Sequence, residues 1–222
     1  TGNLKFDVKL PPSLLEQGDS IRLAWGPNRL VLVAGSTHEE EEGIVLRAFL
    51  EILGDYPDAL LVLVPRHPER FGRAAQAART AGLRVSLRSE GGVCPPKTQC
   101  FLINAMGELQ RYFAACDVAF VGGSLERIGG HNVLEPAALA KPVVVGPHTF
   151  NFADITQQLV EAGAAVQLAD EKGFEAAVRQ LFEEPETRDR MGQAGRELFL
   201  SGQGAVVRTL EIIDSLLTAE AG

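Results

Sequence analysis

Residues 117–136 read DVAFVGGSLERIGGHNVLEP and contain, in order, a short apolar run, two glycine pairs and the start of a helix. The apolar run at 118–121 has the length of a strand, and the chain from Asn132 onward is typical of a helix after a loop. Glycine pairs lose much backbone entropy on folding, so they indicate places where another group comes close. Asn132 is suited to cap the helix, whose free N–H groups can hold a phosphate. The stretch therefore predicts a nucleotide-gripping strand, loop and helix.

The same alternation of apolar runs and helical segments continues on both sides of this stretch. The continuous apolar run at 30–34 predicts a strand buried on both faces, and further strands are predicted at 60–64, 84–88, 99–103, 118–121, 142–146 and 165–168. Helices are predicted at 39–54, 69–81, 107–116, 132–140, 153–162, 171–183, 185–200 and 204–219. Strands that alternate with helices predict an α/β, Rossmann-like fold with a mainly parallel sheet and helices on both faces.

Residues 1–29 differ from the rest of the chain, because they are rich in proline and glycine and only a short helical piece is predicted, at 13–17. The sequence begins TGNLKFD without an initiator Met, and it reads like the middle of a longer chain. We therefore expect 1–29 to be a linker or lead-in from a missing N-terminal domain, and 30–222 to form the ligand-binding domain.

The composition is ordinary for a soluble globular protein, with 45% hydrophobic and 23% charged residues. The net charge of −8 argues against a nucleic-acid partner, which would require a basic stripe. Cys94, Cys100 and Cys116 lack metal-ligand spacing, so we expect reduced thiols in a cytosolic protein. No apolar run approaches the roughly 18 residues of a membrane span, and no signal peptide is apparent. We therefore expect the chain itself to be soluble.

Ligands of an open parallel sheet bind beyond the carboxyl ends of the strands, so the loops at those ends carry the function. After the first strand, the small residues of GSTH at 35–38 leave backbone N–H groups free for an oxyanion. In the alternative interpretation, Ser36 or Thr37 simply caps the next helix. After the second strand, Pro65 and Arg66 belong to PRHP, where an arginine can meet a phosphate or carboxylate bidentately.

Two later loops contain residues suited to a nucleoside. Met106, Gly107 and Glu108 follow the fourth strand, and backbone amides there can read a base edge while Met106 covers its face. A plain helix start explains this turn equally well. Glu135 lies three residues after Asn132, so it can close a capping box or accept two hydrogen bonds from vicinal ribose hydroxyls.

Seven strings occur in order across nearly the whole chain: TGNLKFD (1–7), AGSTHE (34–39), PRHPERF (65–71), MGEL (106–109), DVAFVGGS (117–124), IGGHNVLEPA (128–137) and GPHTFNF (146–152). Together they resemble the 3-deoxy-D-manno-octulosonic acid (Kdo) transferases of lipopolysaccharide synthesis. Proteins of that family are about twice as long as this chain and pair two Rossmann-like domains across a cleft, the GT-B architecture. The resemblance implies that this chain is the C-terminal domain, which binds the donor CMP-Kdo.

The resemblance also implies which residues have roles in the site. The contacts with CMP that it implies are Pro65, Arg66, Met106, Gly107, Glu108, Asn132, Val133, Leu134 and Glu135. It places the general base, a glutamate, in the N-terminal domain, so we expect no catalytic residue in this chain. The acceptor surface and the attachment to the membrane are expected mainly in that other half as well.

The expected reaction is an inverting transfer of Kdo from CMP-Kdo to the lipid A precursor, at the cytoplasmic face of the inner membrane. Arg66 and the helix start at Asn132 are expected to stabilise the charge on the departing CMP. CMP carries one phosphate and the sequence contains no Asp-x-Asp pair, so we expect no required metal and no cofactor. The alternatives are another GT-B transferase, a UDP-sugar epimerase, or a module that only binds its ligand. The apolar residues of 204–219 are expected either to complete the core or to contact a partner domain.

Overall fold

The computed structural model describes residues 2–8, 10–91 and 94–220, with side chains in the last helix described up to Asp214. These residues form one seven-stranded sheet in which all neighbouring strands are parallel, in the order β3-β4-β2-β1-β5-β6-β7. The strands are β1 (Val31–Thr37), β2 (Leu60–Pro65), β3 (Val85–Leu87), β4 (Cys100–Leu102), β5 (Val118–Val121), β6 (Val143–Val145) and β7 (Ala165–Gln167). The predicted α/β fold with a parallel sheet is confirmed.

The centre of the sheet explains why its strands could be recognised and where a ligand can bind. Every residue of β2 and β5, and all of β1 except Ser36, is buried, because helices cover both faces. From β1 the chain passes to β2, then to β3 at the edge of the sheet and back to β4 between β2 and β3, and it finally crosses to β5 on the other side of β1. The loops after β1 and β5 therefore diverge at a topological switch point, where open α/β sheets form their ligand crevice.

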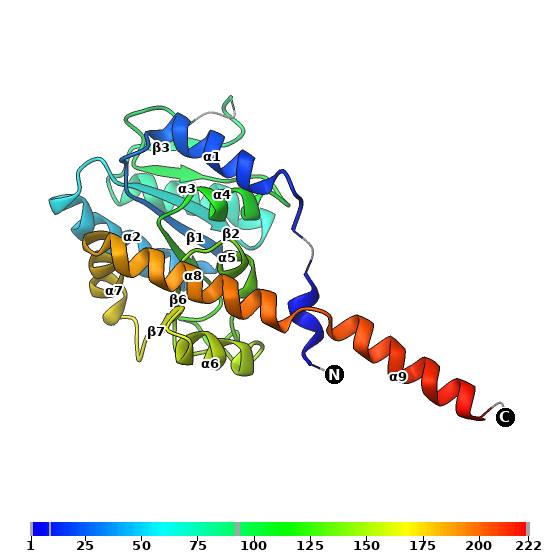
Figure 1. Cartoon of the computed structure of the whole chain (residues 1–222). Helices are drawn as coiled ribbons and strands as arrows, with labels where there is room; N and C mark the ends of the chain where they lie inside the picture. Colours follow the sequence, from blue (N-terminus) through cyan, green and yellow to red (C-terminus); the bar gives the residue numbers. More distant parts are fainter. Residues whose placement is uncertain (1, 9, 92–93, 221–222) are drawn as a thin grey trace.

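Helices pack on both faces of this sheet (Figure 1). One apolar cluster joins the sheet to α1 (Leu14–Trp25), α4 (Leu109–Ala115), α5 (Leu134–Ala138), α6 (Ala153–Glu161) and α8 (Pro185–Gly202). A second cluster on the opposite face joins it to α2 (Glu39–Asp55), α3 (Phe71–Thr80) and α7 (Gly173–Glu183). Short 3₁₀ turns, η1 (Leu4–Asp7) and η2 (Pro68–Arg70), and a last helix, α9 (Ala205–Glu220), complete the described elements.

The first 29 residues contain more structure than the short helical piece expected at 13–17. Helix α1 runs for 12 residues, and its Leu14 and Trp25 are buried against the sheet. Trp25 stacks on Tyr112 of α4, with ring centroids 6.0 Å apart. Gly18, which reads as a helix breaker in sequence, lies at the contact, where an added Cβ would come within 2.5 Å of the Ala114 Cβ. Close packing on α4 therefore outweighs the low helix propensity of this glycine.

Helix α5 is shorter than predicted, and α9 decides between the two alternatives expected for 204–219. Helix α5 begins at Leu134 and has five residues, so it is shorter than the helix expected at 132–140. Helix α9 runs away from the body of the molecule (Figure 1), and Val206, Val207 and Leu210 on it are between 41% and 59% exposed. Apart from the buried Ala205 at its start, the described side chains of α9 therefore do not complete the core of this domain.

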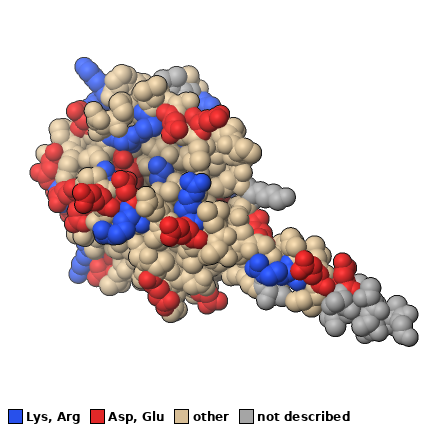
Figure 2. Space-filling model, in the orientation of Figure 1, with Lys and Arg blue, Asp and Glu red and all other residues tan. Residues whose placement is uncertain are grey.

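The cysteines and the charged side chains are arranged as the composition led us to expect. Cys94, Cys100 and Cys116 are free and buried, as the prediction of reduced thiols requires. Burial raises the pKa of the Cys100 and Cys116 thiols to about 12. On the face shown in Figure 2, acidic and basic side chains lie among one another, and no continuous basic stripe covers that face.

Candidate functional site

A pocket of about 370 Å³ lies at the carboxyl ends of β1, β2 and β5, at the predicted edge of the sheet. Its volume falls in the range of about 300–1,000 Å³ that is usual for small-molecule sites. It is lined by residues from the ends of these strands, from the chain around the start of α4 and from the chain leading into α5. These residues are Ser36, Val64, Pro65, Arg66, Ala105, Met106, Gly107, Leu109, Gln110, Phe113, Val121, His131, Asn132 and Glu135.

Six of the nine residues predicted to contact CMP line this pocket: Pro65, Arg66, Met106, Gly107, Asn132 and Glu135. The other three have side chains directed elsewhere. Glu108 forms ion pairs with Arg88, at 3.0 Å, and with Arg111. Val133 and Leu134 are 1% and 0% exposed and belong to the core.

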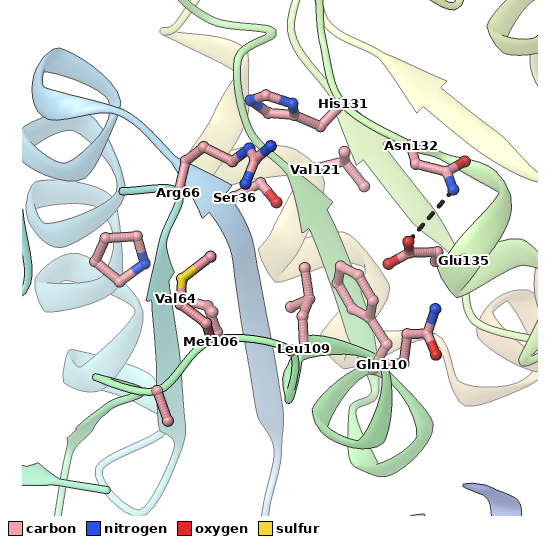
Figure 3. A pocket seen from close by; sticks show the side chains of 14 residues that line it. Ser36, Val64, Arg66, Met106, Leu109, Gln110, Val121, His131, Asn132 and Glu135 are labelled. Atoms are coloured by element: carbon pink, nitrogen blue, oxygen red, sulfur yellow. Dashed lines mark hydrogen bonds between the residues drawn. The ribbon is translucent and has the colours of Figure 1, made fainter. Parts of the chain in front are cut away.

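The pocket has two chemically different ends (Figure 3). Arg66, Ser36 and His131 lie at one end, so a cation and several hydrogen-bonding groups converge there. Glu135 and Gln110 lie toward the other end. A ligand with an anionic group at one side and hydroxyl groups at the other fits this distribution.

Two amide side chains lie beside Glu135. Asn132 donates its Nδ2 to Glu135 Oε1 at 3.3 Å, and the amide of Gln110 lies close to the same carboxyl group (Figure 3). Asn132 also accepts the backbone N–H of Leu134 at 3.1 Å, so it ties the start of α5 to the carboxylate. Burial raises the pKa of Glu135, and the two amides oppose that rise. The Glu135 carboxyl group is thus fixed toward the pocket by side chains and does not act as the second half of a capping box.

The backbone amides at 123–125, in the first part of the glycine-rich loop after β5, are already occupied within the protein. The backbone N–H groups of Gly123, Ser124 and Leu125 donate to the carboxylate of Glu41, at 2.7, 2.9 and 2.8 Å. Glu41 itself is fully buried. The group that approaches these backbone amides is therefore a carboxylate from the protein's own helix α2.

The start of α2 is likewise occupied from within the protein. Its N-cap is His38, not Ser36 or Thr37. Glu126 accepts the backbone N–H groups of Glu40 and Glu41 at 2.7 and 3.1 Å. The free oxyanion site that we expected at GSTH is thus filled by Glu126, because a carboxylate near a helix start satisfies the same donors.

Ser36 contributes to the pocket through an irregular backbone. It lies at a bulge in β1, where the register with β2 shifts between Gly35 and Thr37. Its φ is 55°, a left-handed value that is uncommon for a residue other than glycine. The bulge brings the Ser36 carbonyl so close to Gly122 that an added Cβ on this glycine would lie 2.5 Å from the carbonyl oxygen. Gly122 is therefore needed for the contact between the two central loops.

Two histidines meet beside Arg66. The Nε2 atoms of His38 and His131 are 2.8 Å apart, and the two rings are nearly parallel. His67 meets the His38 ring edge-on, with centroids 5.5 Å apart. Burial, together with the neighbouring His38 and Arg66, lowers the pKa of His131 to about 4. Both imidazoles of the pair are therefore neutral near pH 7 in the free protein.

Sequence reasoning did not assign ligand contacts to eight of the fourteen residues that line the pocket, of which three are polar: Ser36, His131 and Gln110. Ser36 and His131 stand in the predicted loops, so their position in GSTH and IGGHNVLEPA was an available signal. Gln110 lies on the second turn of a helical segment and carried no signal of its own. His148, the histidine of GPHTFNF, does not line the pocket.

None of the described helices is long and apolar enough to cross a membrane. Within the same part of the chain, no group of three or more His, Cys, Asp or Glu side chains is arranged to hold a metal ion.

The chain is similar in sequence and in structure to known proteins. It is 40% identical over 98% of its length to the 3-deoxy-D-manno-octulosonic acid transferase of Haemophilus influenzae, and equally to that of Bordetella pertussis. It also matches the crystal structure of the C-terminal CMP-Kdo binding domain of WaaA from Acinetobacter baumannii. That match has a TM-score of 0.79 and 33% identity, and it covers 83% of this chain and 97% of the other. The chain belongs to the Kdo transferase family.

The extent of the match shows which part of a Kdo transferase this is. The chain spans about half of the two curated relatives, 51% of each. Residues 94–198 match the family described as glycosyl transferases group 1. A glycosyltransferase from Rickettsia africae, 15% identical with a TM-score of 0.64, shares the fold over 96% of this chain and 54% of its own. The chain is thus one Rossmann-like half of a GT-B architecture.

Proposed function

We propose that this chain is the donor-binding domain of a Kdo transferase and that its ligand is CMP-Kdo. The observation that carries the proposal is the pocket, which combines Arg66, the exposed Met106 and the fixed carboxyl group of Glu135 at the switch point of the sheet. The 33% identity with a CMP-Kdo binding domain supports this choice of nucleotide.

The two ends of the pocket suggest how CMP lies in it. Arg66 is exposed and suited to the phosphate, which it can meet bidentately. Glu135 is suited to the ribose, because a carboxylate can accept hydrogen bonds from two vicinal hydroxyls. Met106 is 57% exposed, and a base lying between it and the turn at Gly107 would cover that apolar side chain. Glu108, Val133 and Leu134 are left to contribute through their backbones.

For the whole protein we propose inverting transfer of Kdo to the lipid A precursor, at the cytoplasmic face of the inner membrane. The general base and the acceptor site would lie in an N-terminal domain, with residues 1–29 leading from it into this domain. On this view the chain by itself binds donor without turning it over. An assay of Kdo transfer with and without the other half of the protein tests this, and turnover by this chain alone would contradict it.

We also propose that donor binding needs neither a metal nor a cofactor. A single phosphate carries less charge than a diphosphate, and Arg66 faces it from the pocket. The affinity for CMP, measured by calorimetry, is expected to be the same with EDTA as with added Mg²⁺. A tenfold or larger loss in EDTA would show that a cation is required.

Calorimetric titration tests the nucleotide assignment. CMP is expected to bind, and UDP and UMP to bind more weakly, whereas a UDP-sugar enzyme would reverse that order. Arg66→Ala is expected to weaken CMP binding by about tenfold to a hundredfold, since charged hydrogen bonds contribute about 1.5–3 kcal/mol. Arg73→Ala, at an exposed arginine of α3, is the matched control and is expected to leave binding unchanged.

A second titration tests the ribose contact. Glu135→Gln is expected to reduce the affinity for CMP about tenfold and to reduce that for 2′-deoxy-CMP much less, because only CMP presents both hydroxyls. Glu186→Gln, on the exposed surface of α8, is its control. If the substitution at Glu135 weakened both ligands equally, the ribose role would be wrong.

A further inference from the structure

Three of the four histidines of this chain gather at the Arg66 end of the pocket. Of these, only His131 lines the pocket, and its ring is joined to that of His38 through a contact of 2.8 Å between the two Nε2 atoms. Each ring belongs to a different central loop, since His38 follows β1 and His131 follows β5. The pair therefore bridges the two loops that diverge at the switch point.

The geometry of the pair limits the number of protons that it can hold. One proton lies between the two Nε2 atoms, because a distance of 2.8 Å requires one nitrogen to donate and the other to accept. In the neutral pair, one ring then carries a proton on Nδ1 and the other does not. One additional proton makes both Nδ1 atoms donors and gives the pair a positive charge. A second additional proton would place two N–H groups against each other, so the pair takes up one at most.

Charged groups from each neighbouring element act on this pair. From the loop after β2, Arg66 and His67 oppose protonation of both rings. From α2 and the loop after β5, Glu41 and Glu126 favour the protonated form of His38. Both carboxylates already accept two or more backbone N–H groups, which spreads their charge. Burial, which disfavours the charged form, has the largest effect on each ring.

We propose that His38 and His131 act as one proton-sharing unit, which takes up a single proton when the phosphate of the nucleotide ligand binds beside Arg66. The phosphate offsets the charge of Arg66 and supplies an acceptor for an Nδ1–H at the pocket end of the pair. This inference rests on the proposed function, because it requires a nucleotide phosphate at that end. Its consequence is a donor affinity that increases as the pH falls.

The proton uptake can be counted directly by calorimetry. The probe is cytidine 5′-methylphosphate, a diester like the donor, so its own phosphate does not titrate in the working range. Titration at about pH 6 in two buffers of different ionisation enthalpy is expected to show uptake of between about half a proton and one, and at about pH 8.5 almost none. Cytidine, which lacks the phosphate, is expected to bind without uptake. Equal uptake with cytidine overturns the inference.

Substitution of single histidines tests whether the proton uptake comes from the pair or from another histidine. His131→Gln is expected to abolish the uptake and to weaken binding of the diester about tenfold at pH 6, with little change at pH 8.5. His38→Gln is expected to reduce the uptake as well. His148→Gln, outside the pocket, is the matched control and is expected to retain it. Uptake that persists in His131→Gln overturns the inference.

A measurement on the unsubstituted protein protects the test against variants that fold poorly. Imidazole ¹⁵N NMR spectra are expected to show one Nε2–H and one Nδ1–H tautomer for the pair, and a doubly protonated ring after the diester is added at pH 6. Failure of CMP to bind at all would contradict the proposed function. Binding of CMP without uptake from the diester, or without binding of the diester, overturns only this inference.

Discussion

At the scale of single residues, the side chain with the most hydrogen bonds to the central loops is a buried one that does not line the pocket. Glu41 is fully buried, and its carboxylate accepts backbone N–H groups from His38, Gly123, Ser124 and Leu125. Four such bonds explain how a charged group can be buried without a cationic partner among them, since each donor replaces a water molecule. By fixing the loop after β5, Glu41 also fixes the chain that leads to His131.

We predict that Glu41→Gln destabilises the fold by about 2–4 kcal/mol, because the amide presents an NH₂ group to backbone donors and leaves some of them unsatisfied. Urea unfolding followed by circular dichroism measures the loss. Glu40→Gln, one position earlier and exposed, is expected to change the free energy of unfolding by less than about 0.5 kcal/mol. Equal effects of the two substitutions would show that the buried bonds contribute little.

The histidine pair gives a prediction about stability without ligand. The pKa of His131 is lowered from 6.5 to about 4, so the neutral ring is favoured in the folded protein. The corresponding stability is present above the unfolded value of 6.5 and is lost as the pH falls toward 4. We expect the free energy of unfolding to decrease over that range by roughly 1–3 kcal/mol more in the wild type than in His131→Gln. A His148→Gln variant with the same flattened profile would contradict this assignment.

At the scale of elements, the first helix shows how packing can outweigh propensity. Gly18→Ala raises the helix propensity of α1, but its Cβ would lie 2.5 Å from the Cβ of Ala114. We predict that it destabilises the domain by about 1–3 kcal/mol through forced separation of α1 from α4. Gly43→Ala, within α2, meets only the end of the Arg47 side chain at 3.5 Å and is expected to stabilise by about 0.5–1 kcal/mol.

The measurement for this pair of substitutions is chemical unfolding followed by the fluorescence of Trp25, the single tryptophan of the chain. Because Trp25 stacks on Tyr112 of α4, its emission also reports whether α1 stays in place in the folded state. Effects of the same sign for Gly18→Ala and Gly43→Ala would contradict the close-contact explanation.

Elements of the central sheet could be predicted from sequence because their strands are buried on both faces and so appear as continuous apolar runs. The start of α5 and the length of α1 could not, since both depend on contacts with α4 and the sheet. In the site, Arg66, Met106 and Glu135 were found by their position after strands. The roles of Glu41 and Glu126 were not, because they bond residues more than 80 positions away, which no local pattern records.

At the scale of the whole molecule, the pocket is assembled from one chain, although that chain spans 51% of its curated relatives. Its lining comes from both sides of the switch point, that is, from the ends of β1 and β2 and the chain around the start of α4 on one side, and from β5 and the loop after it on the other. On the proposed function, the nucleotide end of the donor would therefore be held without contributions from another domain. This is why CMP binding, rather than transfer, is the property by which the isolated chain is best tested.

Helix α9 gives a prediction at the same scale. Val206, Val207, Leu210, Ile212 and Ile213 are each more than 40% exposed, so little apolar surface is buried when α9 forms. We predict that deleting 204–222 shifts Tm by no more than about 3 °C and leaves the affinity for CMP unchanged, because about 1 kcal/mol corresponds to 2–4 °C in a domain of this size. Deleting 1–26 instead removes the buried Leu14 and Trp25 and is expected to lower Tm by more than about 8 °C. Scanning calorimetry of the two truncated chains measures both changes in Tm. A large decrease in Tm on deletion of 204–222 would mean that α9 belongs to the cooperative folding unit.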